Sequence, residues 1–125
     1  KMINNEICPT FNEFFRGISN INKADLLLHL STVAKSLGLI NLKGYYDDYT
    51  VELQCKTIEG ATVFVSYKFM GPFTVSDISV SPRHHNTQEL RDACSELSEN
   101  GNTQVTIAKK RGVSQSRVSQ VLKEN

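Results

Sequence analysis

The stretch Thr103–Leu122 constrains the fold more than any other part of the sequence, because two short helical patterns flank a single glycine there. Gly112 stands where the first helix has to end, and glycine adopts the left-handed conformation of a helix end at little cost. Ser114 follows as a candidate cap for the second helix. The residues that form the core of this motif are Ile107, Ala108, Gly112, Val113, Val118 and Val121. They predict two helices that cross steeply over a tight turn, which is a helix-turn-helix.

The spacing of these residues resembles the helix-turn-helix of bacterial, phage and plasmid transcriptional regulators, over about 20 of the 125 residues. In that family a small residue precedes a glycine, a β-branched residue and a further apolar residue at fixed intervals. The corresponding residues here are Ala108, Gly112, Val118 and Val121. Arg111 departs from the pattern, since an apolar residue usually precedes the glycine, although its aliphatic stem can cover the core. The C-terminal third is also loosely similar to TrfB-type plasmid repressors and to regulators of fimbrial adhesin biosynthesis.

The resemblance implies double-stranded DNA as a partner and assigns contacts by position. The residues at or beside the positions that meet base edges are Gln115, Ser116, Arg117, Ser119 and Gln120. The candidates for contacts with phosphate groups are Thr103, Gln104, Thr106, Lys109, Lys110, Ser114 and Lys123. A recognition helix over residues 115–123 fits the major groove, where glutamine pairs with adenine and arginine with guanine. The alternative is that these polar residues form only the solvated face of a surface helix.

The distribution of charge also points to a nucleic-acid partner. The net charge of the chain is only +1, and residues 1–85 carry as many acidic as basic side chains. Residues 100–123, in contrast, contain Lys109, Lys110, Arg111, Arg117 and Lys123 and no acidic side chain. A basic stretch on a motif of this shape is the expected footprint of a phosphate-binding surface.

Residues 1–82 predict an α+β domain that serves dimerisation or binds a partner. Thr10 and Glu13 have the spacing of a capping box, which predicts that a first helix begins there and stops at Gly17. A second helix is expected from Asn22 to Lys35. Its apolar stripe is either core or a dimer seam.

From residue 49 onward the apolar residues alternate with polar ones, as in half-buried strands. The pattern predicts a three-stranded antiparallel meander, with turns at 57–61 and at Gly71-Pro72. A shift of the alternation near Asp77 indicates a bulge. Residues 45–49 are expected to form an exposed loop, whose acidic and aromatic character would also suit a protein-binding edge.

A hinge is expected at Ser81–His85, because proline does not fit inside a central strand. Asn86 and Glu89 then mark the start of another helix, whose buried stripe runs from Leu90 to Leu97. Residues 83–125 therefore predict a three-helix DNA-binding domain that contains the helix-turn-helix. The predicted fold class is α+β, with two helices and a meander followed by this unit.

Other features narrow the class of protein. No apolar run is long enough to span a bilayer and no signal peptide precedes Met2, so a cytoplasmic protein is expected. Cys8, Cys55 and Cys94 are widely spaced, which predicts reduced thiols and neither a disulfide framework nor a zinc site. The pair His84-His85 with Cys94 matches no familiar metal-ligand spacing. We identify no catalytic set and no phosphate-binding glycine loop, so neither an enzyme nor a cofactor is expected.

Two functions follow from these observations. The first is a sequence-specific transcriptional regulator, a repressor that acts as a homodimer, because one helix-turn-helix contacts few base pairs. The second is an antitoxin or accessory protein, whose N-terminal domain binds a protein partner while DNA binding serves autoregulation.

Overall fold

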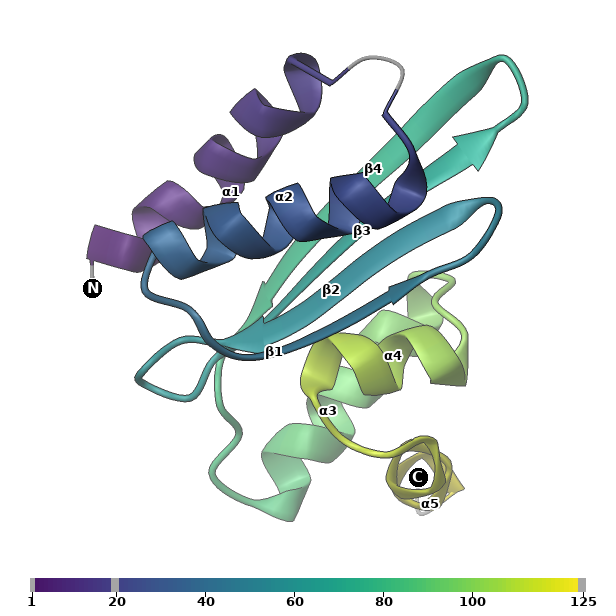
Figure 1. Ribbon diagram of the computed structural model, residues 1–125. Helices are drawn as coiled ribbons and strands as arrows, with labels where there is room; N and C mark the ends of the chain where they lie inside the picture. The colour runs from purple at the N-terminus through teal and green to yellow at the C-terminus, as the bar shows by residue number, and fades with distance from the viewer. Residues whose placement is uncertain (1, 19–20, 124–125) are drawn as a thin grey trace.

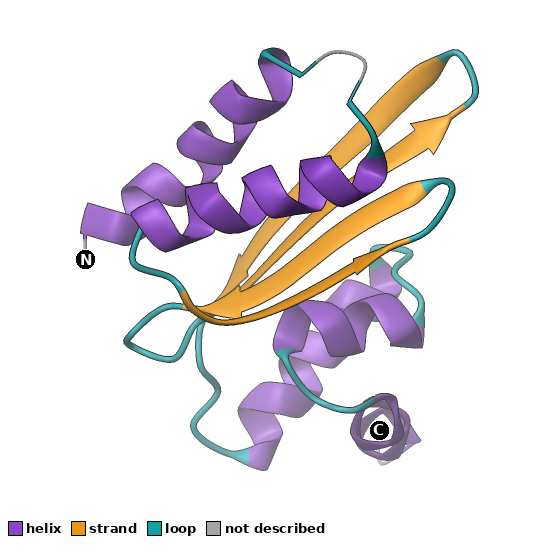
Figure 2. Ribbon diagram, viewed as in Figure 1, coloured by secondary structure: helices purple, strands orange, loops and turns teal. Residues whose placement is uncertain are grey.

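The computed structural model describes residues 2–18 and 21–123. These residues form five helices and one four-stranded antiparallel sheet, so the fold is α+β. In chain order the elements are α1 (Met2–Arg16), α2 (Lys23–Ser36), β1 (Ile40–Tyr46), β2 (Thr50–Lys56), β3 (Thr62–Met70), β4 (Phe73–Ser81), α3 (Thr87–Glu99), α4 (Gln104–Arg111) and α5 (Gln115–Lys123). Helices α1 and α2 cover one face of the sheet, and α4 lies against the other (Figures 1 and 2).

The two N-terminal helices differ in how well the sequence predicts where they begin. Helix α2 begins as expected, because the side chain of Asn22 accepts a hydrogen bond from the backbone amide of Asp25 at 2.8 Å. The prediction that the first helix begins at Thr10 is wrong, since α1 already begins at Met2 and continues through Pro9. Ile7 and Phe11 are both fully buried, so one apolar stripe crosses the expected boundary. Burial of that stripe outweighs the local capping signal.

The sheet contains one strand more than the three-stranded meander that the sequence predicts. Its strand order is β1-β2-β3-β4, and every neighbouring pair is antiparallel. Strand β1 lies at an edge and its side chains are almost all exposed, so its sequence carries no alternation. Tyr45 and Tyr46 therefore belong to β1 and not to a loop, and residues 47–49 form the turn to β2.

The irregularity in the sheet also lies elsewhere than predicted. Strands β3 and β4 pair in unbroken register from Thr62 with Ser81 to Met70 with Phe73, so there is no bulge at Asp77. The register shifts instead in β1, between Ile40 and Lys43, where Asn41 has a φ of +58°. The apolar residues of β4 change from odd to even positions near Asp77 without any bulge. The first five residues of the strand are all exposed to solvent, so burial does not impose an alternation on them.

The two faces of the sheet differ in chemistry. The buried residues that face α1 and α2 are Val51, Leu53, Cys55, Val63, Val65 and Tyr67. Helix α2 comes so close to β1 that a Cβ atom at Gly44 would lie 2.8 Å from Cδ2 of Leu27. The opposite face is mainly polar, and Phe64, which is only 4% exposed, is its large buried apolar residue. The main core therefore lies on the side of the N-terminal helices.

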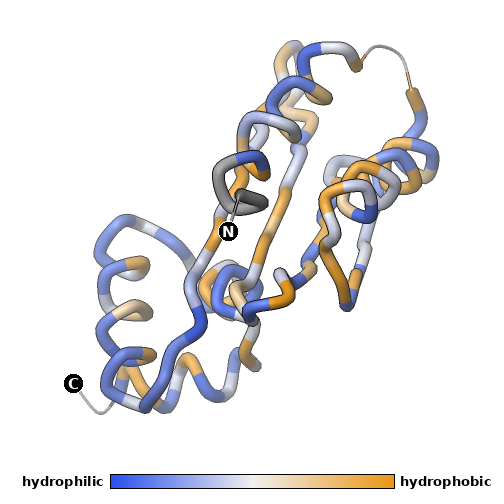
Figure 3. The backbone as a smooth tube through the Cα atoms, turned by 90° about the vertical axis from the view of Figure 1, so that its left-hand side faces the viewer, coloured by the Kyte–Doolittle hydropathy of each residue, from blue (hydrophilic) through white to orange (hydrophobic). Residues whose placement is uncertain are grey.

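The C-terminal helices surround a separate core. Its fully or almost fully buried members are Leu90, Cys94, Ile107, Ala108, Val118 and Val121, as the motif predicts for the last four. Along these helices hydrophilic and hydrophobic segments alternate, which is typical of helices with one buried side (Figure 3). The sequence predicts a three-helix unit of its own, and in the structure α4 also packs against β3 and β4. The sheet thus lies between two apolar cores.

The three cysteines are free thiols, with Cys55 and Cys94 buried and Cys8 half-buried. Burial raises the pKa of the Cys55 thiol to about 12. None of the helices in the described part of the chain is both long and apolar enough to cross a membrane.

Candidate nucleic-acid interface

The segment from Thr103 to Arg117 is held by side-chain caps and a glycine turn. The hydroxyl of Thr103 accepts a hydrogen bond from the amide of Thr106, and the hydroxyl of Ser114 accepts one from the amide of Arg117. Between the two helices, Gly112 has a φ of +70° and its amide donates to the carbonyl of Ala108 at 2.8 Å. These local bonds place the end of α4 and the start of α5 where the sequence predicts them.

One side of α5 is buried and the other borders a groove of about 430 Å³, which we call the α5 groove. The residues that line it are Gln104, Gln115, Ser116, Ser119, Gln120 and Lys123. All six were predicted from the sequence to contact DNA, four of them through bases and two through phosphates. Their polar side-chain groups are amides, hydroxyls and one ammonium group, and no carboxylate lines the groove. Such a surface offers hydrogen bonds to base edges and a charge for a phosphate.

Arg117 is not part of the lining of the α5 groove. Its guanidinium group donates to Oε1 of Gln120 at 3.0 Å and to the hydroxyl of Thr87, at the start of α3, at 3.2 Å. The side chain therefore links α5 to α3. In this arrangement Arg117 orients Gln120, a role that the sequence does not reveal because Thr87 lies 30 residues away.

Lys109 and Lys110 face the sheet. Nζ of Lys109 lies 2.7 Å from Oε1 of Glu52, and Nζ of Lys110 lies 3.2 Å from Oδ2 of Asp77. Nζ of Lys110 also donates to Oδ1 of Asn102 at 3.0 Å. The side chain of Lys110 is only 12% exposed. The two charges that were expected to meet phosphates are therefore paired with carboxylates of β2 and β4. Neither partner was predicted, since both lie far away in the sequence.

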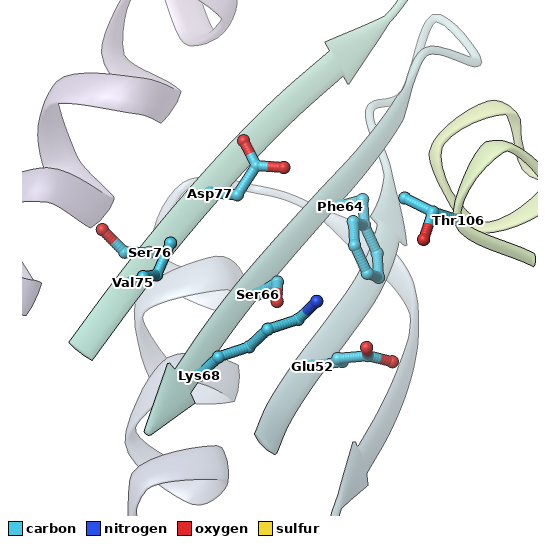
Figure 4. Close-up of a pocket in the computed structure, with 8 residues that line it drawn as sticks. All are labelled: Glu52, Phe64, Ser66, Lys68, Val75, Ser76, Asp77 and Thr106. Atoms are coloured by element: carbon cyan, nitrogen blue, oxygen red, sulfur yellow. The ribbon is translucent and has the colours of Figure 1, made fainter. Parts of the chain in front are cut away.

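Thr106 also faces the sheet, at a cavity of about 310 Å³ between α4 and strands β2, β3 and β4. In Figure 4, Phe64, Ser66, Lys68 and Glu52 lie on the side of the sheet that faces Thr106. Nearby, the side-chain amide of Gln54 donates to the carbonyl of Lys109 at 2.8 Å. The contact between α4 and the sheet is thus polar, and it fixes the orientation of the helix-turn-helix relative to the N-terminal part of the chain.

A basic cluster lies where the α4–α5 turn meets the sheet and α3, and it consists of Lys56, Arg111 and Arg117 around His84. Burial, followed by the positive charges of Arg111, Lys56 and Arg117, lowers the pKa of His84 below its usual value of 6.5. Lys56 belongs to β2 and was not predicted as a functional residue. The only signal for it in the sequence is its place at the end of a strand.

The depressed pKa of His84 has a consequence for stability. Because the unfolded chain takes up a proton near pH 6.5 more readily than the folded chain, stability from this group is complete above that pH. It is lost as the pH falls through the lower, folded-state pKa. We expect His84→Gln to reduce the fall in the free energy of unfolding between pH 7 and pH 5.5, measured by urea denaturation. An equal fall in the free energy of unfolding in His84→Gln and in the wild type would contradict this prediction. His85→Gln is the matched control, and it should show the wild-type fall.

Among the described residues, no group of three or more His, Cys, Asp or Glu side chains is arranged to hold a metal ion. Comparisons of the chain with protein-family models, with curated proteins and with solved structures found no match.

Proposed function

We propose that this chain is a sequence-specific double-stranded DNA-binding transcriptional regulator, a cytoplasmic dimeric repressor that reads the major groove with α5. The observation that carries the proposal is the α5 groove, which brings Gln115, Ser116, Ser119 and Gln120 together on one exposed surface. At about 1.5 Å per residue, the nine residues of α5 span roughly 13 Å, a length that suits insertion into the major groove.

The chemistry of the groove supports base reading. A glutamine amide offers one donor and one acceptor, which matches N6 and N7 of adenine. Gln115 and Gln120 provide two such amides, and Gln120 is oriented by Arg117. Gln104, at the start of α4, and Lys123, at the end of α5, flank them and are suited to phosphates.

Selection of bound sequences from a random duplex library by the full chain tests this function. We expect an enriched consensus with two-fold symmetry, since a dimer of helix-turn-helix units binds two related half-sites. Recovery of sequences without any shared motif would overturn the proposal of sequence-specific binding. An enriched motif without symmetry would retain sequence reading and overturn the dimer.

Strand β4 supports pairing between two copies. It is an edge strand whose nine residues pair with β3 in unbroken register, and it contains neither proline nor a basic residue. The other edge, β1, is protected by its bulge and by Lys43, which are common defences against pairing with another chain. The exposed run of β4, residues 73–77, has Val75 at its centre. Two copies placed antiparallel around Val75 would continue the sheet.

The variant Val75→Lys tests this arrangement. Two lysines would face each other across the two-fold axis, so we expect a monomer by light scattering at concentrations where the wild type is a dimer. Ile58→Lys is the matched control, because Ile58 is also an exposed aliphatic residue but lies in the turn after β2. A Val75→Lys protein that remains dimeric would place the dimer interface away from β4.

A second function, the antitoxin or accessory protein, is favoured by the β1–β2 turn. Tyr45 and Tyr46 at the end of β1 and Tyr49 in the turn are each at least half exposed. Asp47 orders the turn, because its carboxylate accepts hydrogen bonds from the amides of Tyr49 and Thr50 and from the hydroxyl of Tyr45. Exposed tyrosines on an ordered turn suit a protein interface. Co-purification of the product of a neighbouring reading frame, lost in a Tyr46→Ser/Tyr49→Ser variant, would support this function over simple repression.

A further inference from the structure

Two groups of basic residues near the helix-turn-helix differ in their partners. Lys109 and Lys110 form ion pairs with Glu52 and Asp77 on the sheet. The three cations of the basic cluster differ, because no carboxylate of the described residues lies within ion-pair distance of Lys56, Arg111 or Arg117. Apart from Lys123 in the α5 groove, the positive charge near the helix-turn-helix that has no carboxylate partner among the described residues therefore lies at the α4–α5 turn.

The geometry of the turn brings these cations together. A Cβ atom at Gly112 would lie 2.9 Å from Nζ of Lys56, so the ammonium group of this β2 residue touches the turn that follows Arg111. Lys56 also donates to the hydroxyl of Thr62 at 3.0 Å, a bond that holds the ammonium group in place. Arg117 approaches from α5 and reaches Thr87 of α3. Lys56 of β2, Arg111 at the end of α4 and Arg117 of α5 thus bring three positive charges together around His84.

The groups around the basic cluster do not neutralise its positive charge. Nε of Arg111 is buried and has no hydrogen-bond partner among the described residues. His84 lies in the same cluster and is neutral at pH 7, because burial and the neighbouring cations lower its pKa. The acidic residue that faces the cluster is Glu89, and its Oε1 atom accepts a hydrogen bond from the amide of His85 at 2.7 Å. One carboxylate therefore faces three permanent cations.

Resting on the function proposed above, we propose that Lys56 and Arg111, with Arg117, form a phosphate-binding site for the backbone of duplex DNA. Arg117 connects this site to the α5 groove through its hydrogen bond to Gln120. The site extends the DNA-binding surface beyond the helix-turn-helix to the sheet, since Lys56 lies in β2. It assigns the backbone contact to the unpaired cations of the cluster in place of Lys109 and Lys110.

The salt dependence of binding tests this site with a matched pair of variants, Lys56→Gln and Lys68→Gln. Lys56 pairs with Thr62 at one end of β3, and Lys68 lies at the other end of the same strand, so both variants remove one positive charge from the sheet. Glutamine retains a donor for Thr62. Affinity for a fixed duplex is measured by fluorescence anisotropy at several salt concentrations, with thermal unfolding as a check on folding.

For Lys56→Gln we expect the slope of log K against log salt to be smaller in magnitude by about 0.9 and the affinity at 0.1 M salt to fall roughly eightfold, the loss of one phosphate contact. For Lys68→Gln we expect the wild-type slope. The loss in Lys56→Gln should be equal for specific and random duplexes, because phosphate contacts carry no sequence information.

Equal slopes in Lys56→Gln and the wild type would overturn the site. If Lys56→Gln unfolds, Arg111→Gln takes its place, with the same expected change in slope and the same contradicting outcome. The two proposals fail separately. A wild-type chain that binds all duplexes alike, with a slope that depends on Lys56, retains the phosphate site and refutes the sequence-specific regulator. A chain that selects a consensus sequence, with a salt slope that does not depend on Lys56, retains the sequence-specific regulator and refutes the phosphate site.

Discussion

Replacing Gly112 by alanine should destabilise the folded chain by about 2–5 kcal/mol. Gly112 has a φ of +70°, a conformation that costs a residue with a Cβ atom about 1–2 kcal/mol. The new Cβ atom would also lie 2.6 Å from Oγ1 of Thr62, a strand residue that is only 2% exposed and cannot move aside easily. Overpacking of this kind typically costs about 1–3 kcal/mol. Urea denaturation followed by circular dichroism measures the change.

Gly71→Ala separates the two contributions to this loss. Gly71 has a φ of +67°, almost the value of Gly112, but no atom lies within 4 Å of the position of its Cβ. Its replacement should therefore cost only the backbone term, about 1–2 kcal/mol. Equal losses in Gly71→Ala and Gly112→Ala would show that the α4–α5 turn does not pack against the sheet. A larger loss in Gly112→Ala supports the fixed contact.

Replacing Gln115 and Gln120 by alanine should reduce the preference for the selected consensus over a scrambled duplex. Each good bidentate pair contributes about 1–3 kcal/mol of discrimination against the wrong base. Each substitution is therefore expected to lower the ratio of specific to non-specific affinity by roughly 5-fold to 150-fold. The affinity for the scrambled duplex should change little, because neither side chain carries charge. Competition binding with both duplexes at one salt concentration measures the ratio.

Lys123→Gln provides the contrast within the same groove. Lys123 lines the α5 groove with the two glutamines but offers a charge for phosphate. Its replacement should weaken both duplexes by the same factor and leave their ratio unchanged. If Gln120→Ala behaved like Lys123→Gln, Gln120 would not read a base.

The sequence predicts the parts of this fold that local chemistry controls. The cap of Asn22, the glycine at position 112 and the apolar spacing of α5 each act within a few residues, and the structure has them where the sequence places them. Strand β1 escapes prediction because an edge strand with exposed side chains has no apolar alternation. The start of α1 escapes it because a buried stripe extends the helix past the capping signal at Thr10.

The candidate site also contains residues that the sequence predicts and residues that only the tertiary fold reveals. Five of the six residues of the α5 groove follow from helical spacing, which fixes the side of α5 on which each lies, and Gln104 follows from its place at the start of α4. The partners of Lys109 and Lys110 do not follow from it, because Glu52 and Asp77 reach α4 only through the tertiary fold. The sequence does not predict a role for Lys56 for the same reason, because only the tertiary fold brings this β2 residue to the α4–α5 turn. Net charge along the chain therefore locates the basic segment but does not show which of its charges remain free to bind phosphate.

The central claim is that duplex DNA binds at the α5 groove, and mapping of backbone amide shifts by NMR on addition of the selected duplex tests it most directly. We predict the largest shifts at Gln115, Ser116, Ser119 and Gln120, and small shifts in α1 and α2. Shifts confined to Tyr45, Tyr46 and Tyr49 at the β1–β2 end of the sheet, or no shifts at all at saturating duplex, would contradict the claim.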